Sequence, residues 1–248
     1  EYFDIFVEYA KAGPEDICIK ITAANRGHET KPLHVLPTVW FRNTWSWTND
    51  STKPSASETT ENSIVSIKLE KELHRNYTLY CEGLPEVLFC ENETNNRRLF
   101  SAENVSAYTK DGIGDYVVNG NKDAVNARQF GTKAAARYRF DIGAGESKEV
   151  YLRLTSSPLP PGEFTASCKT IFDQRKLEAD EFYSEIIPSN LSPDARNVMR
   201  QSLAGMLWSK QYYHYVVKQW LDGDEASPQP PKQRGIGRNT EWKHLYND

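Results

Sequence analysis

The stretch Asp16-Ile17-Cys18-Ile19-Lys20-Ile21-Thr22 decides the fold class, because its isoleucines recur at every second position. Side chains two residues apart lie on the same face of a β-strand, so the three isoleucines would line one buried face. The preceding residues 2–9 are rich in aromatic and β-branched residues, and Gly13-Pro14-Glu15 between the two segments is a turn signal. The chain is therefore predicted to begin with a β-hairpin.

On both sides of this stretch, the first 157 residues contain short strand patterns separated by turn signals. Further strands are predicted at residues 33–41, 64–69, 77–81, 87–90, 134–141 and 148–154. This arrangement is typical of an antiparallel β-sandwich. The segments 43–62 and 92–132 are too long for simple hairpin loops, so we expect elaborated loops there. A rigid scaffold often carries its functional residues on such loops.

After the proline-rich run 156–162 the pattern becomes helical. One helix is predicted over 164–187, ending before Pro188. A second should begin at the N-cap Ser192 with Pro193 in its first turn, and continue to a stop at Asp222-Gly223. We therefore expect a sandwich domain over 1–157, the start of a helical domain over 158–223, and an irregular connector over 224–248.

Charge and hydropathy exclude some classes of partner. The net charge is -4, and the sequence has no lysine and arginine run of the kind that follows phosphates, so no nucleic acid is expected. No apolar stretch is long enough for a membrane span, so no membrane is expected. The N-terminus has neither an initiator Met nor a signal-peptide pattern, which indicates an internal point of a longer protein.

The cysteines and histidines predict neither a metal site nor a cofactor. Four scattered cysteines form no CxxC pair, and the histidines have no ligand spacing. We expect free thiols, a reducing compartment and hence a cytoplasmic location. The alternative for Cys81 and Cys90 is a disulfide that bridges a hairpin.

Aromatic residues make up 12% of the chain, and two aromatic segments suggest binding sites. In the segment 40–47, one of Trp40 and Phe41 should lie in the core, whereas Trp45 and Trp47 would share a face. These two tryptophans could form a sugar platform or a domain interface. The segment 208–215 would lie within the second helix and is aromatic nearly all round, which indicates a buried helix.

Polar residues give three further candidates. Lys210 and Gln211 are costly to bury without partners, so they could line a polar pocket. The acidic, amide-rich cluster 91–95 could bind hydroxyl groups or a hard cation, or could cap its own backbone. The segment 110–116 lacks the spacing of a phosphate-binding loop and is interpreted as a loop with glycine turns.

Several motifs together resemble glucosidase-like proteins of bacteria and fungi that are related to glycoside hydrolase family 63 and to the mannosylglycerate hydrolases. The motifs that carry this resemblance are residues 32–38 (PLHVLPT), 40–47 (WFRNTWSW), 91–95 (ENETN), 110–113 (KDGI), 131–135 (GTKAA) and 206–213 (MLWSKQYY). The resemblance covers essentially the whole chain, although none of these motifs is a catalytic signature.

The resemblance implies a supersandwich-like β domain followed by the first helices of an incomplete (α/α)6 barrel. It also implies an inverting O-glycosyl hydrolase that acts on α-linked glucosides or mannosides, of oligosaccharide or glycosylglycerate type. Inversion requires an acid and a base about 6.5–9.5 Å apart. The family's acid lies in a Trp-Asp segment, and no Trp-Asp pair occurs here, so we expect the catalytic residues beyond Asp248 and an inactive fragment.

The implied partners are a carbohydrate substrate and the remainder of the catalytic domain. A substrate-side or domain-interface role is implied for five residues: Trp45, Trp47, Lys210, Gln211 and Tyr212. Two other classes remain open from the sequence. The chain could be a non-catalytic sugar-binding sandwich, or a structural module that only docks onto a catalytic domain.

Overall fold

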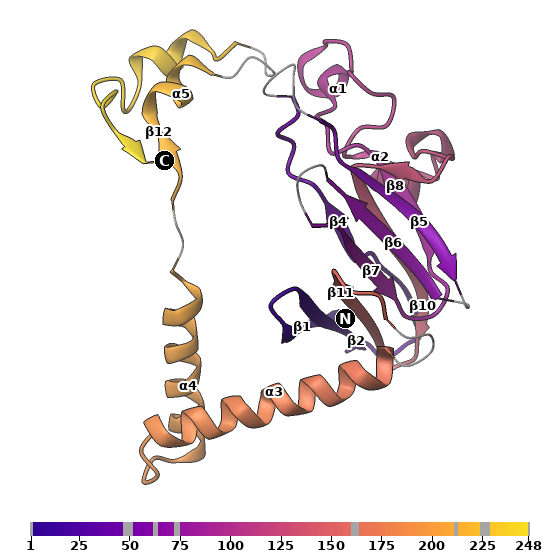
Figure 1. Ribbon diagram of the computed structural model, residues 1–248, viewed down its shortest axis with the longest axis vertical. Helices are drawn as coiled ribbons and strands as arrows, with labels where there is room; N and C mark the ends of the chain where they lie inside the picture. The colour runs from indigo at the N-terminus through magenta and orange to yellow at the C-terminus, as the bar shows by residue number, and fades with distance from the viewer. Residues whose placement is uncertain are drawn as a thin grey trace. The chain divides into compact units, whose positions relative to one another are not determined.

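Figure 1 shows the computed structural model, which describes residues 2–46, 52–61, 64–71, 75–159, 164–210, 213–223 and 229–247. The chain divides into two compact units. The first unit contains Glu1–Asn43 and Thr52–Arg175, and the second contains Thr44–Ser51 and Lys176–Asp248. Antiparallel sheets dominate the first unit, and the protein as a whole is of mixed β and α class.

Among the described residues, seven strands form one antiparallel sheet in the order β1-β2-β11-β7-β6-β5-β9. Their bounds are β1 Phe3–Gly13, β2 Asp16–Asn25, β11 Ser147–Thr155, β7 Tyr77–Cys81, β6 Ile64–Glu70, β5 Ser55–Glu61 and β9 Phe130–Gly131. The predicted hairpin is confirmed, since β1 pairs with β2 from Phe3 opposite Asn25 to Gly13 opposite Asp16.

Strand β5 corrects the expectation of a loop over 43–62. It pairs with β6 along its full length, from Ser55 opposite Glu70 to Glu61 opposite Ile64. Its sequence is polar and Ala56 is its buried residue, so it carries no alternating apolar pattern. The backbone ladder with β6, and not hydrophobic patterning, therefore determines this strand.

The described strands of the second sheet are arranged around β10 (Lys133–Ile142). It pairs with β3 (Lys31–Val35), β4 (Thr38–Trp40) and β8 (Glu86–Cys90), always antiparallel. The single strand predicted over 33–41 is wrong in one respect, because it is interrupted at Leu36 and Pro37. A proline has no N–H to donate to the ladder, and both halves still pair with β10.

One hydrophobic core contains buried side chains from both sheets. Ile67 and Leu152 come from the first sheet, and Phe89 and Ala136 come from the second. Alternate residues of each strand enter this core because strand side chains alternate between faces. Phe41 packs against the core, whereas Trp40 is 58% exposed, as expected for a pair that straddles the strand end.

The long loop 92–132 contains two short helices, α1 (Asn96–Phe100) and α2 (Gly112–Asn119). The interpretation of 110–116 as a plain glycine loop is therefore wrong. A Cβ on Gly112 would lie 2.1 Å from the carbonyl oxygen of Ala124, so this helix start requires glycine. Gly120 ends α2 with φ 71°, and the buried Ile113 packs with Leu88 of β8.

Helix α3 (Phe164–Ile186) confirms the first predicted helix, and α4 (Pro193–Trp208) begins as predicted. The Ser192 side chain accepts a hydrogen bond from the Ala195 N–H, and Pro193 lies in the first turn. In the second unit the end of α3 pairs with α4, where Arg200 bonds Asp180 at 2.6 Å and lies over the Tyr183 ring.

The second predicted helix is too long at its C-terminal end. Helix α4 stops at Trp208, and a two-residue strand β12 (Tyr215–Val216) pairs with β13 (Tyr246–Asn247) before α5 (Val217–Asp222) begins. Residues 212–217 are mostly aromatic or β-branched, which favours extended structure over helix. Gly223 ends α5 as predicted, and the 3-10 helix η2 (Lys232–Ile236) lies within the predicted connector.

All four cysteines belong to the described residues, and all are buried free thiols. Cys81 lies in β7 of the seven-stranded sheet, and Cys90 lies in β8 of the other sheet. They do not flank a hairpin, so the alternative of a bridge between them is wrong. Burial raises the pKa of Cys81 to about 12 and that of Cys90 to about 11, which makes both thiols unreactive.

Candidate functional site

Of the five residues predicted from the two aromatic segments, the structure describes Trp45 and Lys210, both in the second unit. Trp45 is half-buried, and Lys210 is exposed beyond the end of α4. Trp47, Gln211 and Tyr212 lie outside the described residues. The expectation of a buried aromatic helix over 208–215 is wrong for Trp208, which is 85% exposed.

The acidic cluster 91–95 joins strand ends of the first unit. Lys53 contacts Glu91 and Glu93 at 3.1 and 2.9 Å, and the Thr132 hydroxyl donates to Glu91 at 2.6 Å. The Asn92 side-chain amide donates to the carbonyl of Phe41 at 2.8 Å. Two motifs of the resemblance, 40–47 and 91–95, therefore meet in space, and the cluster holds the chain as it leaves β4.

A polar hollow of about 880 Å³ lies beside α1 and α2, and two of its carboxylates, Asp111 and Asp115, are already bonded within the loop. Asp111 accepts hydrogen bonds from Thr109 at 2.6 Å and from the Asn95 amide, and it pairs with Arg98. Burial alone would raise the pKa of Asp111, but these hydrogen bonds outweigh it and lower the pKa. Asn95 also caps α1, so the self-capping interpretation of this loop is favoured.

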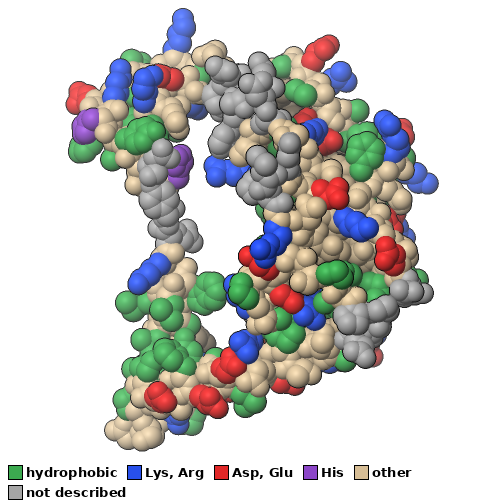
Figure 2. Space-filling view, in the orientation of Figure 1, with side chains coloured by type: hydrophobic (Ala, Val, Ile, Leu, Met, Phe, Trp, Pro, Cys, Tyr) green, Lys and Arg blue, Asp and Glu red, His purple; other side chains and the backbone are tan. Residues whose placement is uncertain are grey.

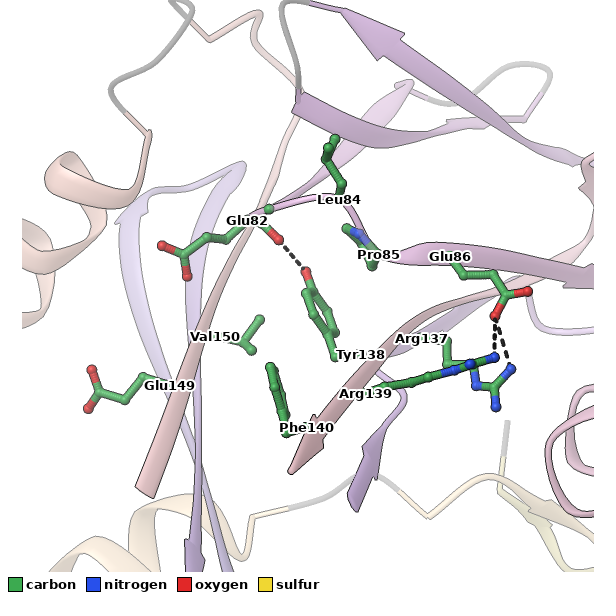
Figure 3. Close-up of a pocket in the computed structure, with 11 residues that line it drawn as sticks. Glu82, Leu84, Pro85, Glu86, Arg137, Tyr138, Arg139, Phe140, Glu149 and Val150 are labelled. Atoms are coloured by element: carbon green, nitrogen blue, oxygen red, sulfur yellow. Dashed lines mark hydrogen bonds and ion pairs between the residues drawn. The ribbon is translucent and has the colours of Figure 1, made fainter. Parts of the chain in front are cut away.

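A different cleft, of about 550 Å³, combines aromatic and charged groups (Figure 3). Its walls are residues 82–85 between β7 and β8, Glu86 at the start of β8, residues 137–140 of β10, and Glu149 and Val150 of β11. It is therefore lined by strands of both sheets. We call it the sheet cleft and take it as the candidate functional site.

The aromatic side of the sheet cleft consists of Tyr138 and Phe140. Their rings stack with centroids 6.0 Å apart and planes 17° from parallel. The Tyr138 hydroxyl donates to the carbonyl of Glu82 at 2.9 Å, which holds the ring in place (Figure 3). Tyr138 is buried and Phe140 is half-buried, so Phe140 supplies the accessible part of the stack.

The charged side is arranged around Glu86. Its carboxylate accepts from Arg137 at 3.0 Å, and Arg139 lies 3.7 Å away (Figure 3). It also accepts from the Tyr116 hydroxyl at 2.5 Å. Burial alone would raise the pKa of Glu86, but the hydrogen bonds from Tyr116 and Arg137 lower it. Glu86 is thus held ionised, which suits a hydrogen-bond acceptor and not a proton donor.

Arg137 is the most buried charge of the sheet cleft. Its side chain is 7% exposed, and its guanidinium lies 5.5 Å from the Tyr116 ring centre. The described part of the chain offers no hydrogen-bond partner to Arg137 Nε. The ion pair with Glu86 is therefore its main compensation.

This chemistry suits the binding of a polyhydroxylated ligand. The accessible part of the Phe140 ring can cover the apolar C–H face of a sugar. Arg137, Arg139 and Glu86 belong to the opposite face of β10, so a ligand meets both groups only around the end of this strand. A third hollow, of about 370 Å³ near β1, is lined almost wholly by aliphatic residues and lacks these polar groups. The sheet cleft is thus the better candidate for a polar ligand.

Sequence reasoning missed every residue of the sheet cleft. Within β10, the alternation of Arg137 and Arg139 with Tyr138 and Phe140 is an available signal, since it places two aromatic rings on one face. Nothing in the sequence brings Glu86 to this strand, because the pairing of Arg137 opposite Glu86 depends on the sheet register.

The described residues were compared with the arrangements expected of a metal site and of a membrane-spanning helix, and match neither. Within the described ranges, no three His, Cys, Asp or Glu side chains gather as metal ligands would. None of the described helices is both long enough and apolar enough to cross a membrane.

Comparison with known proteins gives one relative and no family assignment. No protein-family model matches the sequence. The chain is 34% identical, over an alignment of 288 residues covering 99% of it, to the uncharacterized protein YMR196W of Saccharomyces cerevisiae (strain ATCC 204508 / S288c). The alignment covers 26% of the yeast protein, so the chain spans about a quarter of the length of that relative.

Proposed function

We propose that this chain is the N-terminal part of an inverting glycoside hydrolase, related to family 63, that acts on α-linked glucosides or mannosides. In this proposal the two sheets form a β-sandwich domain, and α3 and α4 are the first helices of an (α/α)6 barrel. The catalytic acid and base belong to the remainder of the barrel. The chain itself supplies substrate contacts and the domain interface.

The observation that carries the proposal is the exposed apolar surface of α3 and α4. None of the residues of α4 is buried, and Val198, Met206 and Leu207 are 57%, 70% and 60% exposed. Leu177 and Phe182 of α3 are 59% and 51% exposed. Figure 2 shows hydrophobic side chains along these helices. Such helices are typical of a larger helical domain whose other helices cover them.

The second candidate function is a non-catalytic sugar-binding sandwich, and the sheet cleft favours it. Phe140 could contact a sugar without any catalytic group. A module that only docks onto a catalytic domain would not use this residue. Measurements of sugar binding by the chain alone therefore distinguish a sugar-binding sandwich from a docking module.

The experiment compares the 248-residue chain with a longer protein in which the proposed barrel follows it. Both are assayed against α-glucosides, α-mannosides and glycosylglycerates, and the product anomer is identified by NMR. Hydrolysis with inversion by the longer protein alone is the expected result. Hydrolysis by the 248-residue chain, or retention of configuration, would contradict the proposal.

Sugar binding by the chain alone is measured in parallel by calorimetry, with Phe140→Ala and the control Phe100→Ala, an exposed aromatic residue outside the sheet cleft. Binding that is lost in Phe140→Ala alone, together with no hydrolysis by the longer protein, would favour the sugar-binding sandwich. No binding and no hydrolysis would favour the docking module.

A further inference from the structure

Two cysteines that are far apart in sequence meet beneath the start of α3. The Cys168 thiol contacts the sulfur of Cys18, with the two Sγ atoms 2.7 Å apart. The two cysteines are separated by 150 positions in the chain. Cys18 lies in β2 and Cys168 in the second turn of α3. Both are fully buried in one cluster with Phe164 and Tyr151. A disulfide needs a sulfur separation of about 2.05 Å, so a small adjustment would bring the pair to bonding distance.

A cation lies beside this pair and lowers the pKa of both thiols. Arg153 of β11 is directly opposite Cys18 in the sheet register. It makes a bidentate ion pair with Asp16 at 2.8 and 2.6 Å, and it donates to the Ser167 hydroxyl at 2.9 Å. The guanidinium is thus fixed between the β2 end and the helix that carries Cys168.

These surroundings divide the roles of the two thiols. The hydrogen bond from Cys168 lowers the pKa of Cys18, burial opposes this, and Arg153 lowers the pKa further. The pKa of Cys168 is raised, first because it donates that hydrogen bond and then because it is buried. Because Cys18 accepts the hydrogen bond that Cys168 donates, we assign Cys18 as the attacking thiolate and Cys168 as the resolving thiol.

We propose that Cys18 and Cys168 form a reversible disulfide by exchange with a low-molecular-weight disulfide, which ties the start of α3 to strand β2. The Cys18 thiolate attacks one sulfur of the small disulfide, forming a mixed disulfide and expelling one thiolate. Cys168 then loses its proton and attacks Cys18 Sγ, which expels the second thiolate. Two protein thiols are oxidised and one small disulfide is reduced to two thiols.

Reagent access requires a local opening, and α3 permits one. Of the 23 residues of α3, Phe164 and Cys168 are buried, so its first turns are attached to the sheet by few contacts. Elements with few buried contacts open at a lower free energy than the whole domain. Oxidation is therefore slow in the closed state, and the disulfide, once formed, prevents this opening. The inference does not depend on the proposed hydrolase function.

The test incubates the reduced native chain with a graded series of oxidised and reduced glutathione, followed by acid quench, thiol counting and peptide mapping. We expect the free thiols to fall from four to two, with a cross-link between the peptides of Cys18 and Cys168. The matched control is Cys81→Ala with Cys90→Ala, which removes the two other buried thiols and should still form the link. Four thiols remaining throughout the series, or a link through Cys81 or Cys90, would overturn the proposal.

Single variants then test the order of attack. Cys168→Ala should accumulate a glutathione adduct at Cys18, at least tenfold more than Cys18→Ala accumulates at Cys168. Equal adducts, or more at Cys168, would overturn the assignment of Cys18 as the attacking thiol. The double alanine variant at positions 81 and 90 keeps the main test valid if either single variant fails to fold.

Discussion

The ion pair between Glu86 and Arg137 should respond asymmetrically to removal of its two partners. The Arg137 side chain is 7% exposed, whereas that of Glu86 is 40% exposed. Glu86→Ala leaves a buried guanidinium without its carboxylate, and breaking a buried pair in this way costs about 3 kcal/mol or more. Arg137→Met keeps most of the apolar volume, and the remaining carboxylate can be hydrated and can still accept from Tyr116. We expect this variant to lose only about 1 kcal/mol.

The double variant Glu86→Ala with Arg137→Met distinguishes two costs in the free energy of unfolding. One is the cost of leaving a buried guanidinium without its carboxylate, and the other is the cost of lost packing. The double variant removes the uncompensated guanidinium, so it should be more stable than Glu86→Ala alone by about 2 kcal/mol. The control is Arg139→Ala, because Arg139 also faces Glu86 but is 63% exposed. Its loss should be below about 0.5 kcal/mol.

The free energies of unfolding are measured in urea, with amide hydrogen exchange of β8 and β10 as a local readout. Exchange in these strands reports on the first unit without contributions from the second. An Arg137→Met variant that is less stable than Glu86→Ala would refute the reasoning. So would a double variant with the full sum of the two single losses.

Three further predictions follow from other parts of the structure. Phe89→Ala should lower the stability of the first unit by about 4 kcal/mol, because the ring is 1% exposed in the shared core; urea unfolding checks this, and a loss below about 1 kcal/mol would contradict it. Ser192→Ala should destabilise α4 by about 1 kcal/mol through loss of its cap, whereas Ser202→Ala, whose hydroxyl bonds the Val198 carbonyl within the helix, should change little; hydrogen exchange in α4 compares the two. Asp111 has a pKa below its ordinary value of 3.8, so its stabilising effect is complete above that pH and is lost as the pH falls through the lowered value. Asp111→Asn should therefore flatten the acid limb of the stability profile, and an unchanged profile would argue against this linkage.

The fold class could be predicted from local patterns because the strands keep a period of two. Val65, Ile67 and Leu69 in β6 alternate with polar residues and are all buried. In β2 the same alternation holds, but Ile21 is buried whereas Ile17 and Ile19 are half-buried. The start of α4 could also be predicted from the sequence, because its cap is a local contact: the Ser192 hydroxyl accepts from the Ala195 N–H, three residues further along the chain. Where the local pattern was absent or ambiguous, as in β5 or beyond Trp208, pairing with another strand decided the structure.

The candidate sites could not be predicted from local patterns, because the residues that form them come together only through sheet register and packing. The Tyr138 hydroxyl reaches the carbonyl of Glu82, 56 positions away, and Cys168 reaches Cys18 across 150 positions. A strand's own residues determine which of its faces is apolar, but not which strand lies beside it. Local sequence patterns therefore predict most of the strands and the starts of the helices. The residues of the sheet cleft and the cysteine pair could be identified only from the tertiary structure, because both depend on contacts between distant segments.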